Sequence, residues 1–408
     1  MSDVEEAITR AHHDEWARVV AALTRRFGDL DIAEEAAAEA FTTAVERWPA
    51  DGVPPNPGAW LTTTAVRKAI DRIRRETKRD DKHKEAQMVY DNTPPEPLGA
   101  IDDDRLRLIF TCCHPALAME SRLALTLRMV GGLTVPEIAR AFLVAESAMG
   151  QRITRAKAKI KAARIPYRMP SAEDLPARVT GVLAVLFLVF NEGYLATGSD
   201  TDPVRHDLTA EAIRLTRLIR ALLPEDGEVA GLLALMLLIE ARRTARVSAS
   251  GELVALDEQD RGAWDKALIA EGHRLVRERL AAGVAPGRYQ ILAAINAVHT
   301  SARDVRDTDW SQVLALYDQL VRLDPSPIIA LNRAIAVAEL DGPEVALAAV
   351  DRLEHRLAGY HAYHATRADL LRRLGRSQQS RAAYDKAIEL AGNTAETAYL
   401  TRRRDQLR

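Results

Sequence analysis

The sequence predicts an all-α protein, and three features support this. Apolar residues make up 47% of the 408 residues, whereas aromatic residues are sparse at 5%. Apolar side chains recur at helical spacing over almost every long window, without the alternation of a strand. A chain of this length exceeds what one hydrophobic core usually serves, so several helical domains are expected.

Two linker-like segments divide the chain. The first is acidic and carries prolines, from Asp80 to Asp104, and the second runs from Ile165 to Pro176. The predicted divisions are a first domain at 1–79, a linker at 80–104, a second domain at 105–168, a helical middle domain at 169–290 and a repeat domain at 291–408.

The last part of the chain repeats itself at an interval of 34 residues, the tetratricopeptide period. The pairs with this offset are Ala334 and Ala368, Leu340 and Leu374, Val350 and Tyr384, and Leu353 and Ala387. Tyr317, Leu320 and Pro325 fit the second helix and closing proline of a divergent preceding unit. About three stacked helical hairpins are therefore expected, because one hairpin cannot cover its apolar face alone. Coincidental similarity between amphipathic helices is the competing interpretation.

A first basic helix is predicted after Trp60, in the segment "WLTTTAVRKAIDRIRRETKR". On a helical wheel its cations form one stripe opposite an apolar edge, and the stripe contains Lys68, Arg72, Arg75 and Arg79. The stripe is either a solvated face or a surface that holds phosphates. The proline-rich loop before it, from Trp48 to Trp60, could hold a base, although Trp60 itself is expected to pack in the core.

A second basic segment, from Gly131 to Arg168, predicts a helix-turn-helix. Thr134 and Glu137 form a capping box, so a short helix begins there and ends near Phe142. After a turn, a second helix follows with Ser147 as its N-cap. The expected packed face of this second helix consists of Met149, Ile153, Ala156, Ile160 and Ala163.

The other face of this second helix is basic, with no acid between Gly150 and Arg168. In a helix-turn-helix the second helix enters the major groove of DNA. We expect Gln151 and Arg155 to read base edges. The remaining predicted DNA-binding residues are Ser147, Arg152, Thr154, Lys157 and Lys159, with the cations nearer phosphates.

Together the two basic segments resemble conserved regions two and four of extracytoplasmic-function (ECF) sigma factors. "DIAEEAAAEAF" and "AWLTTTAVRKAIDRIRR" are similar to the family's region two, and "GLTVPEIARAFLVAESAMGQRITRAKAKI" to its region four. The later segments "VLAVLFLVFNEGYLATG" and "LDEQDRGAWDKALIAEG" look like the long tetratricopeptide-bearing extension of one ECF subgroup. In that subgroup the extension is implicated in control.

This resemblance implies contacts with core RNA polymerase, through its beta-prime clamp helices and beta flap, and with promoter DNA. The implied polymerase-binding residues are Asp31, Glu34, Glu35, Glu39 and Phe41. The implied minus-10 residues are Asp51, Asn56, Arg67, Lys68, Arg72, Arg74 and Arg75, within the loop up to Ala59 and the helix after it. The recognition helix described above would read the minus-35 element.

The sequence departs from the family pattern at several positions. Ala38 stands where the family usually has Gln, and Arg67 where it usually has Asn. Ala148 and Met149 replace a common Thr-Val pair at the start of the recognition helix. The acidic linker either threads the nucleic-acid channel of the polymerase, as the family's connector does, or is a solvated tether.

The alternative functions are a one-component regulator with a tetratricopeptide sensor and an enzyme. Two polar clusters are candidates for an active site: Asn191, Glu192 and Tyr194, and Asp257, Glu258 and Asp260. Neither cluster has a paired His or Cys or a metal-ligand spacing. Polar helix ends are therefore favoured, and no enzyme is expected.

No cofactor or metal is expected either. The adjacent Cys112 and Cys113 predict buried thiols beside His114 and a reducing, cytoplasmic location. The apolar runs Val179 to Phe190 and Val229 to Ile239 are shorter than a membrane span, so they are expected to be core helices. A protein regulator is a possible partner of the repeats.

Overall fold

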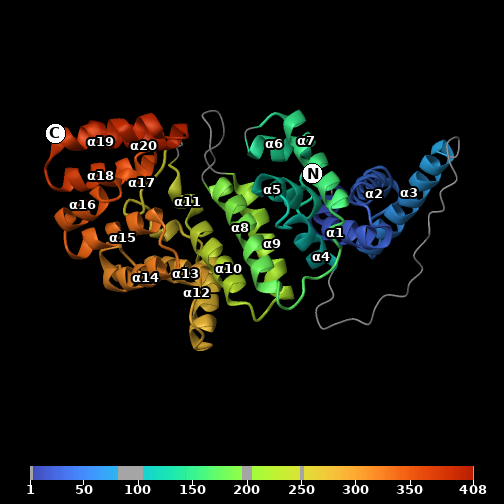
Figure 1. The fold of residues 1–408 in the computed structure, drawn as a ribbon, viewed down its shortest axis with the longest axis horizontal. Coiled ribbons are helices and arrows are strands. Elements are labelled where there is room, and N and C mark those ends of the chain that lie inside the picture. Colours follow the sequence, from blue (N-terminus) through green and yellow to red (C-terminus); the bar gives the residue numbers. More distant parts are fainter. Residues whose placement is uncertain (1–2, 81–103, 143, 195–204, 249–251, 408) are drawn as a thin grey trace. The chain divides into compact units, whose positions relative to one another are not determined.

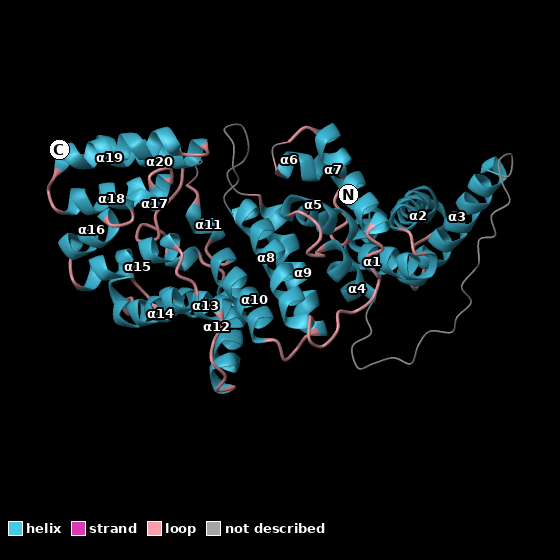
Figure 2. Ribbon diagram, viewed as in Figure 1, coloured by secondary structure: helices cyan, strands magenta, loops and turns pink. Residues whose placement is uncertain are grey.

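The computed structural model describes residues 3–80, 104–142, 144–194, 205–248 and 252–407 (Figure 1). Within these ranges the regular elements are helices, and the only extended pairing is an isolated antiparallel bridge between Val247 and Leu253. The ribbon accordingly shows helices and loops without a strand (Figure 2). The predicted all-α class is confirmed. Most of the acidic linker, including any role as a connector, lies outside the described residues.

The chain forms two compact units, Met1–Leu186 and Phe187–Arg408. The first unit begins with the helices α1 (Asp3–Phe27), α2 (Leu30–Asp51) and α3 (Pro57–Asp80), which pack against one another. Asp29 caps α2, since its carboxylate accepts from the backbone N–H groups of Asp31 and Ile32. The buried face of α2 consists largely of alanines, so α1 and α3 can approach it closely.

The same unit continues with α4 (Asp104–Cys112), α5 (Met119–Met129), α6 (Val135–Ala141) and α7 (Glu146–Ala162). The α4 helix packs against α1 and α5, and α7 packs against α5 and α6. The hydroxyl of Tyr167 lies 3.1 Å from the carbonyl oxygen of Ala21 and 2.9 Å from that of Asp104. This tyrosine therefore holds the segment after α7 against α1 and the start of α4.

Helix α8 (Leu175–Tyr194) is apolar over most of its length. Among the described helices it alone is long and apolar enough to cross a membrane by length and composition, and 39% of its apolar window is buried in the protein. Val182, Leu186 and Phe190 are each no more than 2% exposed. One face of the helix is therefore buried in the protein, whereas Leu188 is 41% exposed.

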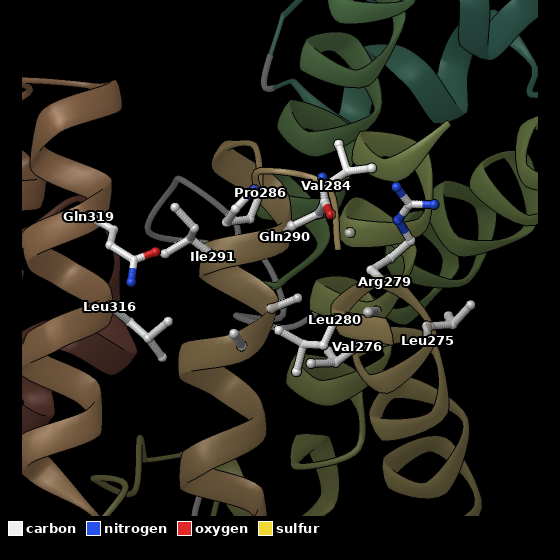
Figure 3. Close-up of a pocket in the computed structure, with 14 residues that line it drawn as sticks. Leu275, Val276, Arg279, Leu280, Val284, Pro286, Gln290, Ile291, Leu316 and Gln319 are labelled. Atoms are coloured by element: carbon white, nitrogen blue, oxygen red, sulfur yellow. The ribbon is translucent and has the colours of Figure 1, made fainter. Parts of the chain in front are cut away.

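The second unit is centred on α10 (Gly227–Glu240), which is hydrophobic on all sides and almost entirely buried. Three helices pack against it: α9 (His206–Leu222), α12 (Lys266–Ala281) and α13 (Arg288–Ser301). A Cβ atom at Gly231 would lie 2.6 Å from the backbone nitrogen of Gln290, so only glycine permits this approach of α10 to α13. A cavity of about 170 Å³ beside this contact is lined mainly by aliphatic side chains (Figure 3).

Helical hairpins form the rest of the second unit. The helices are α14 (Trp310–Leu323), α15 (Pro327–Leu340), α16 (Pro343–Asp351), α18 (His361–Arg373), α19 (Ser377–Leu390) and α20 (Thr394–Asp405), with the short α17 (Glu354–Leu357) between α16 and α18. Successive hairpins share one hydrophobic cluster that contains Ala334, Val350, Ala368, Tyr384 and Ala387.

The internal repeat coincides with these hairpins. Helices α15 and α18 begin 34 residues apart, at Pro327 and His361, and so do α16 and α19, at Pro343 and Ser377. The preceding hairpin, α13 and α14, is divergent, because its connection contains the 3-10 turn Val305–Asp307. Within this repeat, Leu340 at the end of α15 is 44% exposed, whereas Leu374 at the end of α18 packs against the cluster. The finer domain boundaries of the sequence analysis stay a prediction.

Candidate nucleic-acid interface

The acidic residues of α2 contact both basic helices of the first unit. Glu35 and Glu39 face α3, whereas Asp31, Glu34 and the N-cap Asp29 face α7. Glu34, Glu35, Glu39 and Asp31 all belong to the predicted polymerase-binding set. The structure thus brings residues predicted to bind polymerase together with residues predicted to bind DNA.

Of the predicted stripe on α3, Arg75 is exposed, whereas Lys68 and Arg72 are half-buried beside α2. Arg67 and Arg74, next to the stripe, are exposed as well, and the guanidinium of Arg75 donates to the carbonyl of Asp71 in its own helix at 3.2 Å. Lys68 lies 3.8 Å from Glu39, and Arg72 is ion-paired with Glu35. These four side chains are between 32% and 46% exposed, so the pairs are weak and exchange easily with other anions. The side chain of Arg79 lies outside the described residues.

The loop before α3 is structured by its own side chains. Asn56 accepts a hydrogen bond from the backbone N–H of Ala59 at 3.0 Å and so caps α3, and Asp51 is exposed at the end of α2. Trp48 is 1% exposed, and its ring lies edge-on to that of Trp60 at 5.5 Å. The two indoles therefore fix the loop to the bundle, as predicted for Trp60, and Trp48 is not free to stack on a base.

The helix-turn-helix has the predicted capping box. The backbone N–H of Thr134 donates to Glu137 at 2.7 Å, and the N–H of Glu137 lies 3.4 Å from the hydroxyl of Thr134. The start of the second helix was predicted wrongly. Helix α7 begins at Glu146 after Ala145, so Ser147 lies within the first turn and is exposed without capping the helix.

The packed face of α7 is formed by Met149, Ile153, Ala156 and Ile160, which are 8% exposed or less. Ala163 was expected on this face but is exposed at the C-terminal cap. Gln151, Thr154, Arg155 and Lys159 are exposed on the other side, and Arg152 is half-buried. Arg155 donates to the side-chain oxygen of Gln151 at 3.1 Å, so the two predicted base-reading residues lie side by side.

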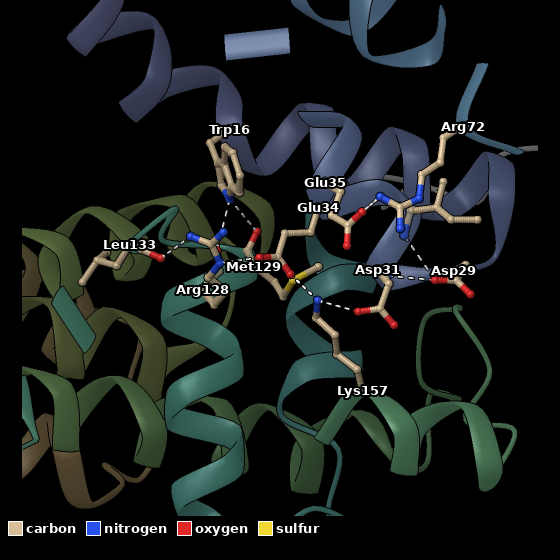
Figure 4. Close-up of polar contacts among 11 residues, drawn as sticks. Trp16, Asp29, Asp31, Glu34, Glu35, Arg72, Arg128, Met129, Leu133 and Lys157 are labelled. Carbon is tan, nitrogen blue, oxygen red and sulfur yellow. Dashed lines mark hydrogen bonds and ion pairs between the residues drawn. The ribbon is translucent and has the colours of Figure 1, made fainter. Parts of the chain in front are cut away.

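Lys157 lies apart from this exposed set. Its side chain is 9% exposed, and its ammonium donates to Asp31 at 2.8 Å and is ion-paired with Glu34 (Figure 4). One turn further along α7, Lys161 pairs with Asp29 at 3.0 Å. In this arrangement Lys157 cannot contact DNA, and Glu34 cannot contact another protein. We name Asp29, Asp31, Glu34, Lys157 and Lys161 the α2–α7 contact.

Arg128 of α5 supports the α2–α7 contact from the other side (Figure 4). Its guanidinium is ion-paired with Glu34 and donates to the carbonyl of Leu133 at 2.8 Å. The indole N–H of Trp16 donates to the carbonyls of Arg128 and Met129, each at 3.2 Å. Glu34 is therefore a buried carboxylate held between two cations from different helices.

The pKa values follow this geometry. Burial raises the pKa of Glu34, but the charges of Lys157 and Arg128 outweigh burial and leave the pKa below its usual value. For Asp29, burial is again outweighed, by the hydrogen bond from Lys161 and by backbone N–H donors, so its pKa is also lowered. Both carboxylates are thus charged, as the ion pairs require.

Phe41 differs from the acidic residues with which it was grouped. It is 6% exposed, and its ring lies 4.9 Å from that of His12 and 5.7 Å from that of Trp16. In this structure Phe41 stabilises the packing of α1 on α2. Sequence reasoning missed Asp29, Arg128 and Lys161 as members of the contact, because nothing local in the sequence pairs residues so distant along the chain.

The remaining chemical candidates have structural roles among the described residues. Cys112 and Cys113 are buried free thiols, as predicted, and burial raises the pKa of Cys113 to about 11. Asp260 accepts from the backbone N–H of Gly262 at 2.8 Å, and Glu258 pairs with Arg402 and Arg403. No group of His, Cys, Asp and Glu that could hold a metal is present in the described part of the chain.

Comparison with known proteins agrees with this geometry. Residues 13–79 match the family model "Sigma-70 region 2", and residues 107–160 match "Sigma-70, region 4". Residues 178–280 match a family of unknown function, DUF6596. The chain is also 44% identical over 396 residues to an uncharacterized protein of Rhizobium meliloti (strain 1021), a match that covers 96% of this chain and 93% of the relative. No solved structure matches.

These matches fall on the elements described above. The region-two match covers α1 to α3, and the region-four match covers the helix-turn-helix and the helices before it. The chain belongs to the sigma-70 family, as an ECF-like member with a C-terminal helical extension. It has a sigma-factor-like role in the initiation of transcription.

Proposed function

We propose that this protein binds core RNA polymerase in the cytoplasm, directs it to specific promoters, and is regulated through its helical extension. The observation that carries the proposal is the set of exposed cations on α3, Arg67, Arg74 and Arg75, in a chain that also has a helix-turn-helix. A regulator that binds only duplex DNA has no need of this second basic surface.

The two surfaces would have distinct roles in promoter binding. The exposed face of α7, with Gln151 and Arg155, would read the minus-35 element, and the other cations of α7 would hold phosphates. The α3 stripe would hold the strands at the minus-10 element as they separate. Asp31, Glu34, Glu35 and Glu39 would bind polymerase.

The α2–α7 contact places a condition on this function. Lys157 belongs to the proposed DNA-binding face and Glu34 to the proposed polymerase-binding face, yet the two are paired with each other. Polymerase would have to separate α7 from α2 before both surfaces are used. The protein would accordingly bind promoter DNA weakly alone and strongly with polymerase.

Run-off transcription with purified core polymerase tests the proposal, using DNA upstream of the neighbouring genes as template. We expect specific transcripts that need both the polymerase and this protein. A shift of the same DNA by the protein alone, without polymerase-dependent transcripts, would support a one-component regulator instead.

Control by the extension needs a separate test. Truncation after Arg168 removes the second unit together with residues 169–186 of the first unit, and promoter output in cells should then change if the extension regulates activity. Unchanged output, with equal amounts of folded protein, would refute a regulatory role. A protein regulator that binds the repeats would be recovered with the full chain but not with the truncated one.

A further inference from the structure

A pocket of about 290 Å³ in the second unit lies outside the proposed DNA and polymerase surfaces. It is bordered by the short helix α11 (Arg243–Arg246), the segment that follows it, and residues of α18 and α20. Its polar lining consists of Tyr194, Arg242, Arg246, Gln259, His361, Glu396 and Tyr399. Aliphatic side chains such as Leu253, Val254 and Leu400 cover much of the remaining wall.

Two arginines of this pocket are buried without a carboxylate partner in the described structure. Arg242 is 9% exposed and Arg246 is 7% exposed. Arg246 donates to the carbonyl of Tyr194 and lies over the Tyr194 ring, 3.2 Å from its centroid. Arg242 reaches only the side-chain oxygen of Asn296, at 3.3 Å. Arg246 also feels the charges of Glu396 and Glu240, but Glu396 is the one carboxylate that lines this pocket against two buried guanidinium groups, so the pocket favours a further anion.

Further polar atoms at the same pocket lack partners. The Nε of Arg242 and the side-chain oxygen of Gln259 are both buried without a hydrogen bond. The amide nitrogen of Gln259 donates to the carbonyl of Val254 at 3.1 Å, which fixes the orientation of the unpaired oxygen. The pocket thus lacks an acceptor for the arginine and a donor for the glutamine.

A second acceptor borders the pocket. Glu396 lies 3.2 Å from a ring nitrogen of His361 and accepts from the side-chain amide of Asn393 at 3.1 Å. Its carboxylate would repel a ligand that is only anionic, but it would accept a hydrogen bond from a hydroxyl or ammonium group. Glu396 and Gln259 therefore both favour a ligand that carries a donor as well as an anion.

Both sequence clusters that remained outside the promoter function contribute to this pocket. "FNEGY" ends at Tyr194, against which Arg246 packs, and "DEQDR" contains Gln259. The segment before Gln259 is folded back on α11, because the N–H of Val254 donates to the carbonyl of Arg246 at 2.8 Å. Backbone bonds therefore position the two clusters around the same cavity.

We propose that this pocket binds a small organic acid whose carboxylate pairs with Arg242 and Arg246. A hydroxyl or amino group near the carboxylate bonds to Gln259 and Glu396, and a short aliphatic body contacts Leu253, Val254 and Leu400. Guanidinium groups suit this ligand, because their planar donors match the two oxygens of a carboxylate. Inorganic phosphate would leave the aliphatic wall uncovered. The cavity of Figure 3 lacks a comparable buried charge, since Arg279 is its one charged lining residue and is not buried.

Thermal unfolding of the full chain tests this site. The probes are 2-hydroxybutanoate, 2-aminobutanoate, butanoate and phosphate, each compared with chloride at equal ionic strength. A ligand that binds only the folded state raises the unfolding midpoint in a saturable way. We expect a rise of about 5 °C with the first two probes, a smaller rise with butanoate, and none with phosphate.

Variants locate the site. Arg242→Gln and Arg246→Gln should each abolish the rise measured against the variant's own midpoint without a probe, because each removes one of the two guanidinium groups that would pair with the carboxylate. Arg243→Gln is the matched control, since Arg243 is 40% exposed and pairs with Glu240 outside the pocket. Ala362→Leu keeps every charge but fills the pocket, and should also abolish the rise.

Several outcomes would overturn the site. They are no rise above chloride with any carboxylate, a rise that persists in Arg242→Gln, Arg246→Gln and Ala362→Leu, and a rise with phosphate alone. An equal rise with butanoate would contradict the proposed role of a hydroxyl or amino donor in the ligand. If the arginine variants do not fold, Ala362→Leu decides the question. The assay contains no polymerase, so its result does not depend on the proposed sigma activity.

Discussion

The two basic helices of the first unit, α3 and α7, are both rich in Lys and Arg but differ in how their cations are held. On α3, Arg67, Arg74 and Arg75 are exposed, and the ion pairs of the helix are weak surface pairs. On α7, Lys157 is buried between two carboxylates of α2. A count of positive charges therefore does not tell which of them are available to DNA.

The difference arises from the neighbours of each helix. Lys157 and Asp31 are separated by 126 residues, and their pairing depends on how the helix-turn-helix packs against α2. On α3, Lys68 and Arg72 pair with Glu39 and Glu35 of α2 at the surface, whereas Arg67, Arg74 and Arg75 are exposed. The exposed cations of α3 are therefore available to DNA, whereas Lys157 of α7 is already ion-paired with carboxylates of α2.

The largest expected effect comes from removing the carboxylate at the centre of the α2–α7 contact. Glu34→Ala leaves Arg128 without its carboxylate and Lys157 with the more exposed Asp31 as its remaining anion, and this should lower the free energy of unfolding of the first unit by about 3 kcal/mol. Hydrogen exchange of α7 in the full chain would measure the loss. Glu35→Ala is the matched control, because its pair with Arg72 is exposed and should contribute less than about 1 kcal/mol.

A double-mutant cycle sharpens this test. Lys157→Met should cost less than Glu34→Ala, since Glu34 keeps Arg128 as a partner. The coupling between the two substitutions should be about 1 kcal/mol or more, as for residues in one ion-pair network. Additive effects would mean that the pairing contributes nothing to the packing of α7 on α2.

The next effect concerns the exposed stripe. Arg74→Ala combined with Arg75→Ala should reduce formation of the open complex about tenfold, because both cations would contact DNA phosphates. Permanganate footprinting measures strand opening, and filter binding measures recruitment. Equal losses in both steps would contradict a role on separated strands. Arg10→Ala with Arg26→Ala, which removes two exposed arginines of α1, is the charge-matched control and should change neither step.

A smaller effect should appear on acidification. The pKa of Glu34 is lowered in the folded protein, so its ion pairs stabilise the α2–α7 contact above the ordinary carboxyl pKa of 4.5. This stabilisation is lost as the pH falls through the lowered value. Exchange of α7 should accelerate over that range in the wild type. A Glu34→Gln variant should lack this step, and an identical profile in both proteins would exclude Glu34 as its source.

The smallest effect tests the start of the recognition helix. Thr134→Ala removes the capping box of α6 and should cost about 1 kcal/mol. Ser147→Ala removes a hydroxyl that caps nothing, so the change should stay within about 0.5 kcal/mol. Thermal unfolding of both variants checks this. A larger loss with Ser147→Ala would restore Ser147 as the cap.

Sequence reasoning was most successful where the interactions are local or periodic. The all-α class, the capping box at Thr134 and the repeat offset that places Ala334 and Ala368 in one cluster all depend on short-range patterns. It failed at Ser147, because a favourable capping residue also occurs inside a first turn. It could not predict the pairing of Lys157, since long-range ion pairs leave no periodic signal.

Glu34 accepts from Arg128 of α5 as well as from Lys157 of α7, and this has a consequence for release of the recognition helix. If α7 swings outward, its lysine gains water while the carboxylate keeps a counter-charge. Glu34 is therefore not left buried without a counter-charge, so the electrostatic cost of detaching α7 from α2 stays low. The α2–α7 contact can therefore hold α7 against α2 in the free protein and still be displaced by a competing macromolecule.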